Sequence, residues 1–471
     1  MKKIAVIGGG PFGIFSALKL SEKKDNQVVL FESSNKLGGL AASEKYKGQY
    51  LDYTTKFIPC NQFGKPGIYS PLNHLLKQKD VLLEDIGDYH FLKDNEKADL
   101  PPFFEKVSKF QLLKEAIGIY KYFSDIDQYS NMIDLENIDG FERNQTFHDL
   151  FKQLGLTTYP KAIDYFSTIF GNSIEGAEAL SVVTSRNSYT NYNYLKKLFT
   201  KNRLLELAGS FIDKSDLLNK HTALPFKFLM LTTGYDIFLQ SLLDNVENAD
   251  IMLNQTIVDI DKDADAKEQY HVINDKNEVF SGFNEVVLAL PMQQLKKFRY
   301  HYINDLVAPI RSERHNYVLT SFCNLESEKL KYLEKGIYLD YNNPHKIGTS
   351  KVKKDGSKYG LFKCFHADTM FQSLTMVNDI DREKIDETFI HDKWYQATTE
   401  FKFDISPSQV KPYGWRVVKW NSPFVQVGDF DKIEKLHRAQ GKQGIWFGGE
   451  IMSGPGVPIT LKYIEDLFRN S

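Results

Sequence analysis

Ile4-Ala5-Val6-Ile7-Gly8-Gly9-Gly10-Pro11-Phe12-Gly13 is the stretch that decides the fold. Its apolar first half predicts a buried strand, and the Gly-x-Gly-x-x-Gly pattern that follows predicts a tight turn into a helix. Glycines are needed there because a turn without Cβ atoms lets backbone N–H groups and the positive end of the helix reach a pyrophosphate. The stretch therefore predicts a dinucleotide-binding site.

The residues after this turn extend the prediction. Phe15 to Leu20 is apolar at helical spacing, and Val28 to Phe31 predicts a second strand that ends at Glu32. Glu32 lies 19 positions after Gly13, counted from 13 to 32. An acid at that distance accepts a hydrogen bond from a ribose hydroxyl and repels a 2′-phosphate. Strand, glycines, helix, strand and acid thus occur in the order that the fold requires.

The composition limits the class of protein. The chain has 471 residues, a net charge of −2 and 42% hydrophobic residues, which is enough for two or three globular units. A nucleic-acid partner is not expected, because neutralising a phosphate backbone needs concentrated Lys and Arg. Cys60, Cys323 and Cys364 form no C-x-x-C pair, so we expect no disulfide framework, no zinc site and a reducing cytoplasm.

The chain carries no signal for crossing a membrane. Met1-Lys2-Lys3 and the short apolar run after it could be mistaken for a secretion signal, but the run ends at the glycine turn and predicts a strand. No window approaches the roughly 18 apolar residues of a spanning helix. His148, His221, His315 and His366 show no metal-ligand spacing, so no metal is expected.

One amphipathic segment, Glu105 to Phe123, allows peripheral membrane contact. Its apolar stripe is Val107, Phe110, Leu113, Ile117 and Tyr120, and its surrounding lysines are Lys106, Lys109, Lys114 and Lys121. Such a helix is expected to cover a domain core and show its lysines to water. The alternative is a helix that lies on an anionic membrane.

Nucleotide-fold signals occur in three separate segments, 1–50, 226–294 and 426–471. The second has Thr232-Thr233-Gly234-Tyr235 before an amphipathic helix, and the third has a strand at Gly444 to Phe447 and a helix from Pro458 to Phe468. Further strands are predicted at Ile251 to Leu253, Thr256 to Ile260, Tyr270 to Ile273 and Glu285 to Leu290. We expect an α/β, Rossmann-like domain from these three segments.

Segments 51–225 and 295–425 differ from the rest, because they are rich in Phe and Tyr and in helical patterns. A chain that leaves the nucleotide domain and returns twice is expected to form one interleaved α+β substrate-binding domain. It would cover the reactive end of the cofactor, where ligands of open α/β folds bind.

Three motifs resemble the flavin amine oxidase superfamily. Gly38-Gly39 resembles the glycine doublet that lies beside the FAD pyrophosphate, and Val258 resembles the strand valine whose backbone meets the adenine. Gly448-Gly449-Glu450, followed by Ser453-Gly454-Pro455-Gly456-Val457-Pro458, resembles the closing motif, whose acid faces the ribityl-pyrophosphate region. The resemblance spans the whole nucleotide domain and implies a glutathione-reductase-like FAD-binding domain. Cys364 is the last cysteine, far from the closing motif, so FAD is expected to be non-covalent.

The resemblance implies a set of cofactor-binding residues. They are Gly8, Gly10, Pro11, Phe12, Gly13, Glu32, Ser33, Lys36, Gly38, Gly39, Leu40, Thr55, Val258, Leu290, Gly449, Glu450, Pro458 and Ile459. Pro458 suits the first turn of a helix, where its missing N–H would be unsatisfied in any case. Free N–H groups of Ile459, Thr460 and Leu461 would then stabilise negative charge on the N1–C2=O edge of the flavin.

Two side chains are candidates for catalysis. Asp52-Tyr53-Thr54-Thr55-Lys56 resembles the stretch that faces the flavin in the family, Asp-x-Gly-x followed by His or another residue, with threonine where glycine is usual. Lys56 would act as a base or fix negative charge, and its alternative is a surface lysine in a loop. Trp420 or Tyr413 would hold a substrate against the ring, and their alternative is core packing. The lysine that amine-oxidising relatives carry has no counterpart near Arg311 to Val318, which argues against an amine substrate.

We therefore expect an FAD-dependent oxidoreductase, an oxidase or desaturase, that transfers a hydride from an apolar small molecule to flavin N5. Only one Gly-x-Gly-x-x-Gly follows a strand, so NADPH is not an expected partner, and electrons go to oxygen, a quinone or another acceptor. The chain resembles the phytoene-desaturase, protoporphyrinogen-oxidase and fatty-acid-isomerase group, which implies a lipophilic substrate. A redox-neutral isomerase and a non-catalytic flavin-binding protein are the alternatives.

Overall fold

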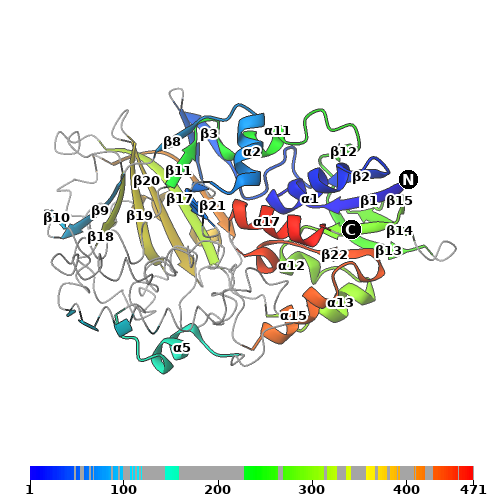
Figure 1. Ribbon diagram of the computed structural model, residues 1–471. Helices are drawn as coiled ribbons and strands as arrows, with labels where there is room; N and C mark the ends of the chain where they lie inside the picture. Colours follow the sequence, from blue (N-terminus) through cyan, green and yellow to red (C-terminus); the bar gives the residue numbers. More distant parts are fainter. Residues whose placement is uncertain are drawn as a thin grey trace.

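The computed structural model describes most of the nucleotide-fold segments and separate parts of the rest. The described residues are 1–46, 49–53, 58–62, 65–66, 68–85, 88–93, 96–98, 107–108, 110–111, 114–115, 118, 144–158, 228–263, 269–311, 316–325, 336–340, 357–365, 370–378, 382–389, 391–392, 408, 410–419, 428–454 and 456–469. Both termini lie at one end of the molecule, and a second sheet lies at the other end (Figure 1).

A five-stranded parallel sheet forms the nucleotide half. Its strands, in spatial order, are β12 (Ala249–Met252), β2 (Asn26–Phe31), β1 (Lys2–Ile7), β16 (Glu285–Leu288) and β22 (Ile445–Phe447). Each neighbouring pair is parallel. The strand order reverses at β1, and the carboxyl ends of strands at such a switch point are where open α/β sheets bind ligands. The predicted α/β, Rossmann-like fold is confirmed.

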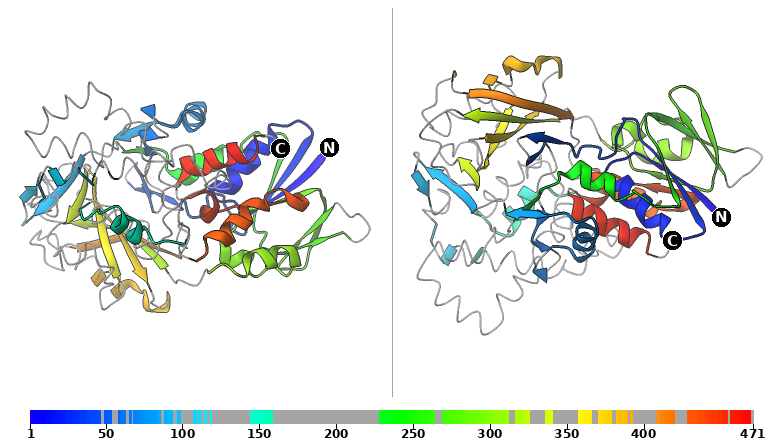
Figure 2. Two further views of the ribbon diagram at one scale, coloured as in Figure 1. Left: turned by 60° about the horizontal axis from the view of Figure 1, so that its bottom comes forward. Right: turned by 90° about the horizontal axis from the view of Figure 1, so that it is seen from above.

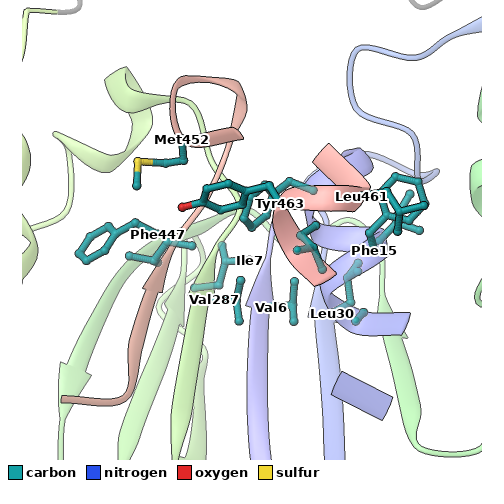
Figure 3. Packing of buried hydrophobic residues seen from close by; sticks show 14 of the residues in the cluster. Val6, Ile7, Phe15, Leu30, Val287, Phe447, Met452, Leu461 and Tyr463 are labelled. Carbon is teal, nitrogen blue, oxygen red and sulfur yellow. The ribbon is translucent and has the colours of Figure 1, made fainter. Parts of the chain in front are cut away.

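Helices α1 (Pro11–Ser21) and α17 (Val457–Leu467) pack side by side over this sheet (Figure 2). Figure 3 shows Phe15 of α1 and Leu461 and Tyr463 of α17 above Val6 and Val287 of the strands. The middle and carboxyl-end residues of β1, β2, β16 and β22 are apolar and mostly buried, because both faces of a parallel sheet are covered. This core fixes the start of each helix relative to the carboxyl ends of the strands.

A three-stranded antiparallel sheet adjoins the parallel one. It consists of β13 (Ile257–Lys262), β14 (Tyr270–Asn274) and β15 (Val279–Phe283). The ring of Phe31 lies 5.0 Å from that of Phe280 and 5.9 Å from that of Phe283 between centroids. These contacts hold β15 against the parallel sheet.

The other half contains a mixed seven-stranded sheet. In spatial order its strands are β10 (Glu96–Ala98), β9 (Asp88–Lys93), β18 (Gly336–Asp340), β19 (Ser357–Phe365), β20 (Met370–Asn378), β17 (Asn316–Leu325) and β21 (Val410–Lys419). The helical patterns expected in 295–425 are therefore misleading for 312–425, where most described residues belong to strands. Phe, Tyr, Thr and Val, which are frequent there, favour strands as soon as a sheet can bury them.

The remaining described elements are shorter. The strands are β3 (Ser43–Tyr46), β4 (Gln49–Asp52), β5 (Ile58–Pro59), β6 (Asn61–Gln62), β7 (Lys65–Pro66), β8 (Leu83–Asp85) and β11 (Phe228–Leu231). The helices are α2 (Ser70–Gln78), α5 (Phe147–Gln153), α11 (Tyr235–Ser241), α12 (Met292–Leu295), α13 (His301–Val307), η5 (Arg382–Lys384), α15 (Phe430–Arg438), η7 (Lys442–Gly444) and α16 (Glu450–Ser453).

The predicted nucleotide-fold elements lie within a few residues of the observed ones. The last helix, predicted from Pro458, begins at Val457. The five-stranded sheet draws strands from each of the three expected segments, while the domain boundaries at 50, 225, 294 and 425 stay a prediction. Among the described residues, no helix combines the length and the apolar character needed to cross a bilayer.

Candidate dinucleotide-binding site

The turn between β1 and α1 admits no side chain at two of its glycines. A Cβ on Gly8, which has φ of +108°, would lie 2.4 Å from the carbonyl oxygen of Ala289. A Cβ on Gly13 would lie 1.8 Å from the carbonyl oxygen of Gly8. These two glycines are therefore required by the fold itself.

Gly10, in contrast, has room for a Cβ. Its φ of −76° and ψ of 179° suit any residue, and the nearest atom to a Cβ there would be the Cα of Gly39, at 3.9 Å. Gly10 precedes the first turn of α1, whose N-terminal backbone N–H groups and partial positive charge favour an anion. The position that a Cβ on Gly10 would occupy thus lies where a pyrophosphate would bind.

Glu32 holds the glycine turn to the end of β2. Its side chain is 9% exposed; Oε2 accepts the backbone N–H of Gly9 at 2.7 Å, and Oε1 accepts that of Ser34 at 2.8 Å. The hydroxyl of Ser33 donates to Oε1 as well, at 3.1 Å. Oε2 keeps a lone pair for one more donor, such as a ribose hydroxyl.

The glycine doublet packs directly on the turn. Gly38 donates its N–H to the carbonyl of Gly9 at 2.8 Å. Gly39 has φ of +58°, and a Cβ on it would lie 2.8 Å from the Cα of Gly10. The structure thus brings both predicted glycine motifs together around one space, with Leu40 beside them, 37% exposed.

Lys36 has a protein partner that sequence reasoning did not predict. Its Nζ lies 3.0 Å from Oδ2 of Asp236, in the first turn of α11. Burial of the Asp236 carboxyl opposes its ionisation, but the hydrogen bonds from Lys36 and Ser43 outweigh burial and lower its pKa. Lys36 therefore ties α11 to the loop that carries the doublet.

Asp52 supports the start of the same helix. Its Oδ1 accepts the hydroxyl of Ser43 at 2.5 Å and the backbone N–H of Tyr235 at 2.9 Å. The residue before α11 is Gly234, which has no side chain to cap the helix. That missing cap was a sequence signal that a polar group from elsewhere must serve α11.

Val258 lies at an irregularity of β13. Ile257 pairs with Asn274 and Asp259 with Ile273, so Val258 is an extra residue with no counterpart on β14. Such a residue leaves its backbone groups outside the ladder, and the side chain of Val258 is 38% exposed. This arrangement suits the predicted contact of its backbone with an adenine.

The link from β12 to β13 brings Val258 to the site, because Gln255 donates its N–H to the carbonyl of Glu32 at 2.8 Å.

The closing motif packs on the turn from the other side. A Cβ on Gly448 would lie 2.4 Å from the ring of Phe12, and one on Gly449, with φ of +97°, would lie 3.1 Å from the carbonyl oxygen of Leu290. Glu450 follows in the first turn of α16 and is half-buried. These glycines let α16 approach Phe12 and Leu290, which were predicted to line the site.

One prediction about α17 is wrong. The N–H of Thr460 donates to the carbonyl of Gly456 at 3.0 Å and is not free, because the helix begins at Val457 rather than Pro458. Leu461 lies one residue deeper in the helix. Pro458 has no N–H, so the first turn leaves the N–H groups of Val457 and Ile459 for a ligand.

A buried polar cluster anchors α17 to α15. Tyr463 accepts a hydrogen bond from Nε2 of Gln440 at 3.1 Å, and its hydroxyl lies 3.1 Å from Nδ1 of His437. Burial lowers the pKa of His437 to about 3 and raises that of Tyr463. Tyr463 therefore donates to a neutral imidazole, whose Nε2 has no partner among the described residues. No sequence spacing indicated this cluster.

The proposed catalytic side chains are not placed. Thr55, Lys56 and Trp420 lie outside the described residues, and Tyr413 lies on β21. Among the residues that are described, no group of three or more His, Cys, Asp or Glu side chains could hold a metal ion.

Comparison with protein families gives one match of wide extent. The model of the flavin containing amine oxidoreductases matches residues 13–326. A shorter relative is an uncharacterized protein in the nifH2 3′ region of Methanothermococcus thermolithotrophicus. It is 35% identical over 95 residues, which are 20% of this chain and 85% of that protein.

Solved structures match over nearly the whole chain. A CLA-producing fatty acid isomerase from P. acnes has a TM-score of 0.67 at 14% identity, covering 99% of this chain and 98% of that one. Cyclohexylamine oxidase from Brevibacterium oxydans IH-35A has a TM-score of 0.65 at 12% identity, covering 99% of both chains. A putative protoporphyrinogen oxidase from Exiguobacterium sp. 255-15 has a TM-score of 0.63 at 14% identity, covering 99% and 98%.

Proposed function

The chain belongs to the family of flavin-containing amine oxidoreductases, which bind FAD, and from this premise we propose that it oxidises an apolar small molecule by hydride transfer to the flavin. The observation that carries the proposal is the glycine turn at the start of α1, where a Cβ on Gly10 would meet only the Cα of Gly39, at 3.9 Å. This turn exposes backbone rather than side chains, and the carboxylate of Glu32 holds it to the end of β2, as a dinucleotide site requires.

Each part of the site suits one part of FAD. Glu32 would accept a hydrogen bond from the adenosine ribose, and the backbone at Val258 would meet the adenine. The first turn of α1 would bind the pyrophosphate, and that of α17 would face the flavin. When bound, FAD supplies an isoalloxazine ring that accepts a hydride.

The protein's own groups would stabilise negative charge near α17. The N–H groups of Val457 and Ile459 point out of the first turn, and the helix adds partial positive charge there. The hydroxyl of Ser453, at the end of α16, lies 3.2 Å from that of Thr460 in the first turn of α17. This contact fixes the direction of the N–H groups.

We infer roles for two further side chains from the resemblance. Lys56 would face the flavin as a base or fixed positive charge, and Trp420 would press the substrate against the ring. An amine substrate is disfavoured by the missing lysine counterpart near Arg311 to Val318. Electrons would pass to oxygen, a quinone or another acceptor, since no second dinucleotide turn serves a nicotinamide.

A redox-neutral isomerisation is the second candidate. The match to a fatty acid isomerase, with a TM-score of 0.67, favours it. In that case the hydride would return to the same substrate one or more carbons away, and no electron acceptor would be consumed.

The experiment is an anaerobic reaction of the purified flavoprotein with unsaturated fatty acids, carotenoid precursors and amines, followed by flavin absorbance and mass spectrometry. Lasting loss of the oxidised flavin band supports an oxidase or desaturase. A shifted double bond at unchanged mass supports the isomerase. Lys56→Met should slow either reaction, whereas Lys45→Met, on the exposed hairpin strand β3, should not. A colourless protein that refuses FAD would contradict the proposal.

A further inference from the structure

The segment around Phe110 turns a polar face to the protein. Glu115 is 1% exposed, and its Oε1 accepts the N–H of Thr157 at 3.0 Å, the hydroxyl of Thr157 at 2.9 Å and the N–H of Thr158 at 3.1 Å. Oε2 accepts the N–H of Thr158 at 3.0 Å, and Gln111 donates from Nε2 to Oε1 at 2.7 Å. The chain directly after α5 is thus held by a buried carboxylate.

Phe110 lies on another side of the same segment. Residues 110–111, 114–115 and 118 are helical, and Gln111 and Glu115, four apart, share the inner face. Phe110 precedes Glu115 by five positions, which turns it about 140° away on an α-helix. Its side chain is 75% exposed, so the prediction that the apolar stripe covers a core is wrong at Phe110.

The exposed side carries positive charge as well. Lys114 is exposed next to Phe110. In the sequence, Leu113 and Ile117 follow Phe110 at helical spacing, and the lysines that intersperse this pattern are Lys106, Lys109 and Lys121. The whole chain has a net charge of −2, so this concentration of lysine is local. An aromatic residue flanked by lysines is typical of helices that lie at the surface of an anionic bilayer.

We propose that the helix around Phe110 docks on an anionic lipid surface. Phe110 enters the acyl boundary while Lys114 contacts the headgroups. Charge complementarity selects a lipid surface rich in anionic headgroups, because Lys114 is exposed near Phe110, lysines are frequent in the surrounding sequence, and the carboxylate of Glu115 is buried. The proposal is independent of the redox chemistry. The surface of Phe110 belongs to a segment that Glu115 ties to the chain after α5, in the half of the molecule away from the termini (Figure 1).

The test is co-sedimentation of the purified full-length flavoprotein with vesicles of phosphatidylglycerol and phosphatidylcholine, and with phosphatidylcholine alone. Binding should require phosphatidylglycerol and fall in 0.5 M salt, which shortens the range of electrostatic attraction to a few ångströms. Phe110→Ser should weaken partitioning at least about tenfold, and Lys114→Gln about fivefold. Circular dichroism and flavin content check that each variant is folded.

Two substitutions elsewhere are matched controls. Leu82 is 71% exposed, and Leu82→Ser removes a comparable apolar side chain from another surface. Lys24→Gln removes one exposed lysine from the nucleotide half. Both should bind vesicles like the wild type. Equal partitioning of Phe110→Ser and Leu82→Ser would overturn the proposal, as would equal binding to neutral vesicles. A change of sedimentation coefficient in Phe110→Ser without vesicles would instead identify an interface between copies and also overturn it.

Discussion

Gly10→Ala separates the fold of the glycine turn from its function. The backbone angles of Gly10 are open to alanine, and the added Cβ would meet nothing closer than the Cα of Gly39 at 3.9 Å. Alanine is a poorer N-cap than glycine by roughly 0.5–1 kcal/mol, and it restricts the unfolded chain by about 0.4–1 kcal/mol. The two effects oppose each other, so the apoprotein should keep its stability within about 1 kcal/mol.

The affinity for FAD should fall in the same variant. The methyl group would lie beside Gly39 at the start of α1 and hold a pyrophosphate away from the N–H groups of α1. A hydrogen bond to a charged group contributes about 1.5–3 kcal/mol, so each bond lost raises the Kd for FAD by roughly 10- to 150-fold. The assay is titration of the apoprotein with FAD by fluorescence, with thermal unfolding of the same samples.

Two other glycines provide the controls. Gly13→Ala places a Cβ 1.8 Å from the carbonyl oxygen of Gly8 and should unfold the turn, so stability and affinity fall together. Gly118→Ala meets only ordinary contacts, the nearest at 3.5 Å, and should raise stability by up to about 1 kcal/mol while leaving the Kd for FAD unchanged. A Gly10→Ala protein with unchanged stability and an unchanged Kd would refute the placement of the pyrophosphate.

Three further predictions follow from buried polar groups. Glu32→Ala should raise the Kd for FAD by about 10- to 150-fold, since the ribose loses a charged acceptor. The control is Glu22→Ala: Glu22 is exposed and pairs with the surface residue Lys19, so its loss should leave the FAD titration unchanged. Asp52→Ala should lower the free energy of unfolding by about 1–3 kcal/mol in urea, because the N–H of Tyr235 loses its acceptor; equal urea midpoints would contradict this role. The pKa of His437 is about 3 in the folded protein and 6.5 for an ordinary histidine, so between pH 3 and pH 6.5 the imidazole binds a proton only in the unfolded chain. The free energy of unfolding should therefore decrease by up to about 1.4 kcal/mol for each pH unit below 6.5. A folded His437→Gln variant whose free energy of unfolding depends on pH in the same way would exclude His437 as the cause.

The nucleotide half could be predicted because its signals are local. Gly13 is fixed by a backbone contact within one turn, and β1 and β2 end in buried apolar residues. Glu32 follows its strand directly, so its proximity to the turn is a consequence of strand pairing between β1 and β2. Each of these features is visible within about thirty residues of the N-terminus.

The polar supports of the site could not be predicted, because their partners are distant in the sequence. Lys36 pairs with Asp236 and Asp52 with the N–H of Tyr235, and each pair joins segments about 200 residues apart. The carboxylate of Glu115 likewise meets its hydrogen-bond donors beyond α5, 42 residues away at Thr157. Spacing along the chain contains no information about such contacts until the topology is known.

The second sheet was missed for a different reason. Strand β17 pairs with β20 and β21, and every pairing joins residues far apart in the chain. Periodicity in Phe- and Tyr-rich segments fits a helix or a buried strand, and only the presence of neighbouring strands decides between them. The roles of Lys56 and Trp420 in that half stay predictions.

The contrast between the two halves explains why a cofactor could be named and a substrate could not. The FAD site is built from backbone, whose sterics permit few residue types, as the 2.4 Å and 1.8 Å contacts at Gly8 and Gly13 demonstrate. A substrate chamber is built from side chains on a sheet, where apolar residues of similar volume replace one another at small cost. One FAD-binding half can therefore accompany oxidases and isomerases alike. Changes at Gly10 should affect all substrates equally, because they act through the shared cofactor.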